Sequence, residues 1–192
     1  EAKATLATAK ENLSQMSSPQ AVVFSKFYRA RAEYRKVVGP PQEFYKDGLM
    51  FLAYTPLEEM LAADASALGR DIALAAITGA DIFNFGEVLA TPILGALSGT
   101  PDAWLTDLVL ALHHGSISEF NTCVDANRAA YFAMPALANT HEEVKRKVVL
   151  LALMNIVFER GSNDRTITFS DIASRTAIPV DQVEWVIMRA MS

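Results

Sequence analysis

Apolar residues recur at three- and four-residue spacing along most of the chain, which is the pattern of helices that bury one face. The stretches from Phe44 to Leu52 and from Trp104 to Leu112 are two examples. Helix-starting and helix-breaking residues divide the pattern into segments of about 12 to 20 residues, the usual length of globular helices. The sequence therefore predicts helices at about 3–16, 20–38, 41–54, 56–78, 85–97, 101–114 and 116–130.

Helix starts are marked by a hydroxyl residue with a carboxylate three positions later, which is the pattern of the capping box. It occurs at Thr55–Glu58, Ser116–Glu119, Thr140–Glu143 and Thr168–Asp171. Short connections between helices of this length favour antiparallel pairs, the building unit of an α-solenoid. Because the chain has no strict repeat period, we expect degenerate repeats.

The segment after Thr140 has a different pattern. Its first turns are charged and include Lys145-Arg146-Lys147, which we interpret as the solvated end of a helix. From Val148 to Leu153 the same helix is apolar on every side. A helix that is apolar all round is buried all round, so we expect it to lie between two packed layers.

The last part of the chain reads as a winged-helix module. Thr166-Ile167-Thr168-Phe169 alternates β-branched residues and predicts a strand, with helices following at about 169–176 and from 180. Helix, strand, helix, turn, helix is the order of a winged helix. The sequence stops at Ser192, before the two wing strands, so we expect this module to be incomplete.

Composition limits the classes of partner. The net charge is −5, and 51% of the residues are hydrophobic, which is typical of a folded chain. There is no overall basic excess to neutralise phosphates, and Asp181 and Glu184 on the last helix outnumber Arg189, so nucleic-acid binding is disfavoured. The apolar run from Val148 to Phe158 is shorter than the roughly 18 residues of a membrane span. We expect a soluble intracellular protein.

Residues that could perform chemistry are scattered. His113, His114 and His141 lack the spacing of a zinc site, and His113-His114 sit where a helix C-terminus favours a cation. Cys123 is a lone cysteine in a helical pattern, which is more often a small buried hydrophobe than a nucleophile. No phosphate-binding or nucleophile-elbow motif occurs. We therefore expect no catalytic, metal or cofactor site and no enzymatic activity.

Three stretches resemble the PCI domain, a family shared by the proteasome lid, the signalosome and a translation initiation factor. They are Ala111–Phe120, Ile167–Ala173 and Val180–Glu184. A further motif, Phe83-Asn84-Phe85-Gly86-Glu87, resembles one component of the proteasome lid. The resemblance implies a mainly α fold with two parts. Residues 1–140 would form right-handed, α-solenoid-like helical repeats of the TPR kind. Residues 141–192 would form a truncated winged helix that lacks the wing strands and the C-terminal helix.

The resemblance also implies a function. It is that of a non-catalytic scaffold subunit in the proteasome regulatory-particle lid, which supports ubiquitin-dependent degradation in the cytoplasm and nucleus. Its partners would be other lid subunits, bound through PCI–PCI contacts, with no nucleic acid, membrane or small-molecule substrate. Two alternatives remain: a PCI scaffold of the signalosome or an initiation factor, and a nucleic-acid-binding winged helix.

A partner interface is predicted at the winged helix. Strand addition to an exposed sheet edge is a recognised mode of protein contact, and Thr166, Ile167 and Thr168 would form that edge. Trp185 falls on the helix face opposite much of the apolar stripe, and aromatic residues in such positions are enriched at interfaces. Trp185 is thus either an interface residue or a residue that the wing would cover.

Overall fold

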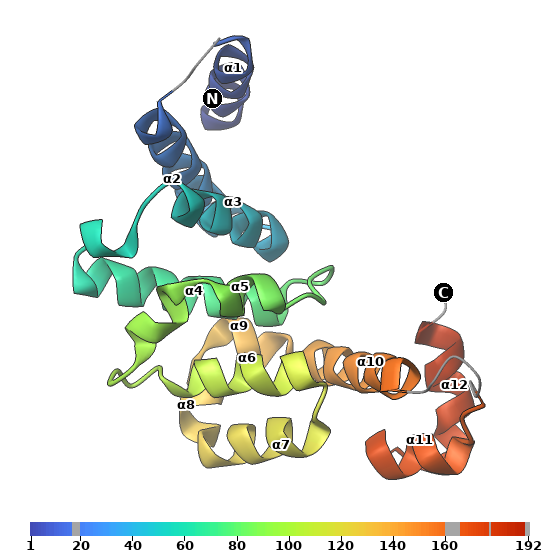
Figure 1. Cartoon of the computed structure of the whole chain (residues 1–192). Helices are drawn as coiled ribbons and strands as arrows, with labels where there is room; N and C mark the ends of the chain where they lie inside the picture. The colour runs from blue at the N-terminus through green and yellow to red at the C-terminus, as the bar shows by residue number, and fades with distance from the viewer. Residues whose placement is uncertain (17–19, 160–165, 177, 191–192) are drawn as a thin grey trace. The chain divides into compact units, whose positions relative to one another are not determined.

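The regular structure of the chain is helical, as the sequence predicts. The computed structural model describes residues 1–16, 20–159, 166–176 and 178–190, and none of these lies in a β-strand. Two compact units divide the chain: unit 1 comprises Glu1–Ile82 and Gly86–Leu105, and unit 2 comprises Phe83–Phe85 and Thr106–Ser192. Figure 1 labels the helices of both units.

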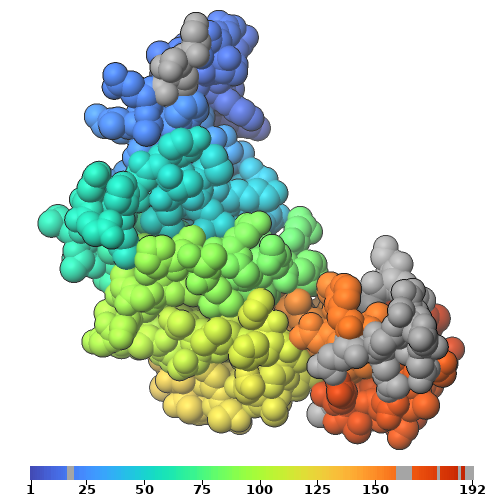
Figure 2. Space-filling view, viewed as in Figure 1, coloured from blue at the N-terminus to red at the C-terminus, as the bar shows by residue number. Residues whose placement is uncertain are grey.

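Unit 1 is a succession of helices in which each packs chiefly on the next. Helix α2 contacts α3, α3 contacts α4, and α4 contacts η2, whereas α1 buries none of its own residues. Figure 2 shows this order as bands of colour from blue to green. Contacts concentrated between elements that are near one another in the chain are typical of helical repeats. The elements are α1 (Ala2–Gln15), α2 (Ala21–Val38), α3 (Pro41–Ala53), η1 (Leu57–Glu59), α4 (Ala62–Thr78), α5 (Gly86–Ala90) and η2 (Pro92–Leu97).

The helix predicted at 56–78 is divided. Residues Leu57–Glu59 form only a short 3₁₀ turn, and α4 begins at Ala62. The capping box predicted at Thr55 does not form, because the Thr55 hydroxyl lies 2.7 Å from the Ser25 hydroxyl of α2 instead. The Thr55 hydroxyl, which the local sequence predicts as a helix cap, makes a tertiary contact instead.

Two other predicted helices are interrupted at residues with known effects on the backbone. Pro92, which has no N–H to donate, separates α5 from η2. Asn127 ends the helix predicted at 116–130, and its side-chain amide donates to the Cys123 carbonyl at 2.9 Å. The backbone amide of Asn127 donates to the same carbonyl at 3.1 Å, so the side-chain bond is added to the last helical one.

A buried ion pair joins α2 to α3. The Arg31 guanidinium donates two bonds to the Asp47 carboxylate, Nε to Oδ2 at 2.9 Å and Nη2 to Oδ1 at 2.7 Å. The guanidinium carbon also lies 5.7 Å from the ring centroids of Phe27 and Tyr28. Burial raises the pKa of the Asp47 carboxyl, and the bond from Arg31 offsets part of that effect.

Replacing Arg31 by lysine is expected to lower the free energy of unfolding by about 1–2 kcal/mol, since lysine keeps the charge but loses the bidentate geometry and the ring contacts. Urea denaturation measures this loss. Arg70→Lys is the matched control, because Arg70 is more exposed and lies 3.6 Å from Asp102. We expect less than about 0.5 kcal/mol there. Equal losses at the two positions would contradict a special role for the Arg31–Asp47 pair.

Unit 2 continues the helical chain around a core that includes Leu108, Leu112, Phe120 and Tyr131, all at most 1% exposed. The first two residues of α6 belong to unit 1. The elements are α6 (Trp104–His114), α7 (Ile117–Ala126), α8 (Arg128–Ala133), α9 (Pro135–Asn139), α10 (His141–Glu159), α11 (Phe169–Thr176) and α12 (Val180–Ala190).

The corner between α6 and α7 lies directly against α10. Gly115 turns the chain with φ of 59°. The Asn155 side chain of α10 donates to the His114 carbonyl at 2.6 Å. The predicted cap at Ser116 is confirmed, because its hydroxyl accepts from the Glu119 amide at 3.3 Å. The polar Asn155 within an apolar helix is thus explained by the carbonyl that it binds.

The last three helices form the helical part of the predicted winged helix. Leu153, Ile172 and Val183, from α10, α11 and α12, form a small hydrophobic cluster. The predicted cap at Thr168 is confirmed, since its hydroxyl accepts from the Asp171 amide at 3.1 Å.

The predicted strand at 166–169 is wrong. Residues 166–168 have no regular structure, and Phe169 is the first residue of α11. A strand's N–H and C=O groups need a neighbouring strand, and none is present among the residues that the structure describes. The alternation of β-branched residues is therefore not sufficient by itself to form a strand.

Candidate protein-interaction surface

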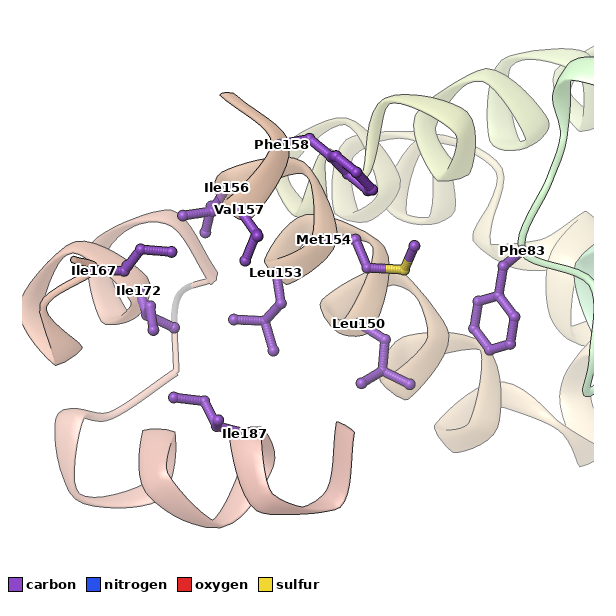
Figure 3. A pocket seen from close by; sticks show the side chains of 10 residues that line it. All are labelled: Phe83, Leu150, Leu153, Met154, Ile156, Val157, Phe158, Ile167, Ile172 and Ile187. Carbon is purple, nitrogen blue, oxygen red and sulfur yellow. The ribbon is translucent and has the colours of Figure 1, made fainter. Parts of the chain in front are cut away.

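An apolar pocket opens beside the C-terminal half of α10, within unit 2. Its volume is about 680 Å³, and the described residues that line it carry no charged side chain. Figure 3 shows Ile172 and Ile187 approaching Leu153 on one side, with Met154 and Phe83 toward the other end. The lining residues are Phe83, Leu150, Leu153, Met154, Ile156, Val157, Phe158, Ile167, Ile172 and Ile187.

The pocket follows from the composition of α10. Val148, Leu151, Ala152 and Leu153 are buried, which confirms the expected burial of this run, although Val149 and Leu150 are half-buried. Beyond Leu153, Ile156 is still buried, but three other apolar side chains of the helix are exposed. Met154, Val157 and Phe158 are 45%, 56% and 78% exposed. Exposed apolar side chains gathered in one place mark binding surfaces more often than scattered ones do.

The four predicted interface residues occupy different environments. Ile167 is half-buried and lines the pocket. Thr166 and Thr168 are exposed, and Thr168 also caps α11. Trp185 is 56% exposed on α12 and does not line the pocket. The structure therefore places Ile167 in the apolar pocket and leaves Trp185 as a separate exposed aromatic residue.

Most of the pocket lining was not singled out from the sequence. The available signal is the apolar stretch of α10, which continues past Leu153 to Phe158 and is too short to span a membrane. None of the helices in the described ranges has the length and apolar character needed to cross a bilayer.

The motif at 83–87 contains the two aromatic rings that meet α10. Phe85 is fully buried, whereas Phe83 is 39% exposed and forms one wall of the pocket. The Lys147 ammonium lies 5.1 Å from the Phe85 ring centroid and 5.8 Å from that of Phe83. Because Lys147 is only 6% exposed, its predicted position in a solvated cluster is wrong. The negative faces of the two rings stabilise this buried cation.

The rest of the motif has a separate environment. Asn84 and Glu87 are exposed, and Gly86 is the first residue of α5. Within unit 1, burial and then the nearby Glu87 carboxylate raise the pKa of Tyr45 to about 12. Tyr45 therefore remains a neutral phenol at physiological pH.

The residues weighed for catalysis lie in ordinary helical settings. His113 and His114 are exposed at the end of α6, and His114 Nδ1 is 3.1 Å from a Glu119 carboxylate oxygen. Burial and the Asp107 carboxylate raise the pKa of the Cys123 thiol, which disfavours the reactive thiolate. Within the described ranges, no group of three or more His, Cys, Asp or Glu side chains is arranged to hold a metal ion.

Comparison with known families divides the chain into two matched regions. Residues 1–109 match the PSD13 N-terminal repeats, and residues 121–192 match the PCI domain. The predicted resemblance to the PCI family is thereby confirmed. Of the three stretches that carried it, Ile167–Ala173 and Val180–Glu184 fall inside the PCI match, and Ala111–Phe120 lies just before it.

Curated relatives match along nearly the whole chain. It is 35% identical over 192 residues to 26S proteasome non-ATPase regulatory subunit 13 homolog A of Arabidopsis thaliana. It is 32% identical over 190 residues, 99% of the chain, to 26S proteasome non-ATPase regulatory subunit 13 of Dictyostelium discoideum. It is 33% identical over 192 residues to a probable 26S proteasome regulatory subunit rpn9 of Schizosaccharomyces pombe. These matches cover 50%, 49% and 49% of the relatives, so the chain spans about half their length.

Proposed function

This chain belongs to the family of the PSD13 N-terminal repeats, and from that premise we propose that it is a non-catalytic scaffold subunit of the proteasome regulatory-particle lid. The names of its relatives, which are 26S proteasome regulatory subunits, support this assignment. In this role the protein assembles with other lid subunits and supports ubiquitin-dependent degradation. It works in the cytoplasm and nucleus, without a cofactor.

The observation that carries the proposal is the apolar pocket of unit 2. Nine of its ten lining residues among those that the structure describes lie in the region that matches the PCI domain, and all ten are apolar. A surface of this kind has the character of the core of a stable protein–protein interface, where charged residues are depleted. A protein partner is therefore the occupant that the chemistry favours over nucleic acid or a polar metabolite.

We further propose a division of labour along the chain. The helical-repeat region, residues 1–140, serves as a stiff arm, and the winged-helix region, residues 141–192, carries the contacts with neighbouring lid subunits. This proposed boundary corresponds to the connection between α9, which ends at Asn139, and α10, which begins at His141, and both helices lie within unit 2. Thr166, Ile167, Thr168 and Trp185 are the proposed contact residues, with Ile167 and the pocket at the centre.

Two other functions predict different partners. A scaffold of the signalosome or of an initiation factor would co-purify with those assemblies, and the names of the relatives favour the lid instead. A nucleic-acid-binding winged helix would show salt-sensitive retention on DNA or RNA. The exposed acids Asp181 and Glu184 on α12 disfavour that binding.

Trp185→Ala tests the proposed interface. Truncating an aromatic contact residue can weaken an interface by about 2 kcal/mol, so we expect recovery of lid subunits to fall tenfold or more. The measurement is affinity purification of the tagged full-length protein followed by quantitative mass spectrometry. Leu61→Ala is the control, since Leu61 is 73% exposed in unit 1 and should leave recovery unchanged.

The two kinds of failure are distinguishable in this experiment. Undiminished lid recovery by Trp185→Ala would remove Trp185 from the interface while keeping the scaffold function. Recovery of signalosome or ribosomal proteins by the unaltered protein would overturn the assignment to the lid. Circular dichroism of each purified variant checks that a lost partner does not reflect a lost fold.

A further inference from the structure

Tyr131 of α8 and His141, the first residue of α10, are in direct contact. The Tyr131 hydroxyl lies 3.1 Å from Nδ1 of His141, and the two rings meet edge to face with centroids 5.4 Å apart. Tyr131 is fully buried, and His141 is partly buried. The Phe132 ring closes another side, with its centroid 5.3 Å from that of His141.

The direction of this hydrogen bond depends on which nitrogen of the His141 ring carries the proton. Burial raises the pKa of Tyr131 to about 12, so this hydroxyl keeps its proton and can donate it. A neutral imidazole with its proton on Nε2 offers Nδ1 as the acceptor. A doubly protonated imidazole has two N–H donors and no acceptor, so it cannot receive this bond. The contact in this direction therefore requires neutral His141.

The surroundings also favour the neutral imidazole. Burial lowers the pKa of His141, the Lys145 ammonium lowers it further, the Glu142 carboxylate raises it, and the Arg128 guanidinium lowers it. Arg128 comes from α8, where it lies over the Phe132 ring at 5.7 Å from the centroid. His141 also begins α10, and the positive end of a helix dipole disfavours an added cation.

We propose that Tyr131 and His141 form an acid-sensitive latch, in which neutral His141 accepts the hydrogen bond from Tyr131 and holds the start of α10 against α8, and protonation of His141 removes this acceptor and weakens the contact. The contact lies at one end of the helix whose other end lines the apolar pocket. The inference goes beyond the scaffold function and does not depend on it. It assigns to this chain a proton-binding site that destabilises the packing of α10 when occupied.

The sign of the pH effect follows from linkage. Because the pKa of His141 in the folded chain is below its ordinary value of 6.5, the unfolded chain takes up this proton at the higher pH. The contribution of the latch to stability is complete above about pH 6.5 and is lost as the pH falls through the lower, folded-state pKa.

Titration of the imidazole resonances by NMR tests the hydrogen bond. In the 192-residue chain we expect His141, assigned by its disappearance in His141→Gln, to titrate below 6.5. Tyr131→Phe removes the donor and should move the pKa of His141 upward. An unchanged or lower pKa in Tyr131→Phe would overturn the latch. Were that variant unable to fold, the unaltered chain still decides, because a His141 pKa of 6.5 or above contradicts the proposal.

Urea denaturation tests the consequence for stability. Between pH 7.5 and pH 5 the unfolding midpoint of the unaltered chain should fall, and His141→Gln should reduce that fall. His114→Gln is the matched control, because His114 is an exposed histidine at the end of α6. In His114→Gln the unfolding midpoint should still decrease on acidification by the amount that His141 contributes. The same pH dependence in His141→Gln as in the unaltered chain would overturn the proposal.

Discussion

Replacing Gly115 by alanine is expected to lower the thermal unfolding midpoint by about 10 °C. Gly115 has φ of 59°, a conformation that costs an L-residue roughly 1–2 kcal/mol. An added Cβ would also lie 2.8 Å from the Leu151 carbonyl carbon and 2.9 Å from the Ala152 amide nitrogen. Overpacking of this kind adds about 1–3 kcal/mol, and here the contacted atoms are helix backbone, which cannot rotate away.

Two other glycines separate the causes of this loss. Gly99 has φ of 76°, and nothing lies within 4 Å of its added Cβ, so Gly99→Ala isolates the conformational cost. Nothing lies within 4 Å at Gly95 either, and its φ is not in the left-handed region, so Gly95→Ala should leave the midpoint unchanged. If Gly115→Ala lost no more stability than Gly99→Ala, the close approach of this corner to α10 would be refuted.

Replacing Phe85 by alanine is expected to cost about 3–5 kcal/mol, the usual range for truncating a buried phenylalanine. Phe85 is fully buried, and the Lys147 ammonium lies 5.1 Å from its ring centroid. The substitution would open a cavity and remove one of the rings that stabilise a buried charge. Chemical denaturation followed by circular dichroism measures the change in the free energy of unfolding.

Phe83 provides the matched comparison within the same motif. It is 39% exposed and its ring is farther from Lys147, at 5.8 Å, so Phe83→Ala should cost roughly 1 kcal/mol. A double-mutant cycle with Lys147→Met isolates the contact between ring and cation, with an expected coupling of about 1–2 kcal/mol to Phe85. Equal losses at Phe83 and Phe85, with no coupling to Lys147, would contradict this account of the motif.

Features encoded by neighbouring residues were predicted better, although two of the four predicted caps did not form: the Thr55 hydroxyl contacts Ser25, and the Thr140 hydroxyl donates to the Ala136 carbonyl at 2.7 Å. The caps at Ser116 and Thr168 form because hydroxyl and amide are three residues apart and need no distant partner. The helix predicted at 169–176 coincides with α11. The burial of Val148 and of Leu151–Leu153 in α10 was predicted because a run apolar on every side leaves no face suited to water.

Features that depend on distant residues were predicted poorly. Thr166–Thr168 did not form a strand, since strand formation needs a second strand in register. Lys147 was expected in solvent but is buried beside two rings from a segment some 60 residues earlier. Of the four predicted interface residues, only Ile167 lines the pocket. Its place there depends on the positions of α11 and α12, which the local sequence does not give.

The sequence by itself determined the helical character of this protein, the limits of most helices and its membership of a family. These depend on periodicity, capping and motif identity, which act over a few residues. The tertiary structure alone decided which apolar surface remains open, which glycine touches another helix and which histidine meets a buried tyrosine. Those outcomes depend on pairs such as Gly115 with Leu151 and Tyr131 with His141, which local patterns do not specify.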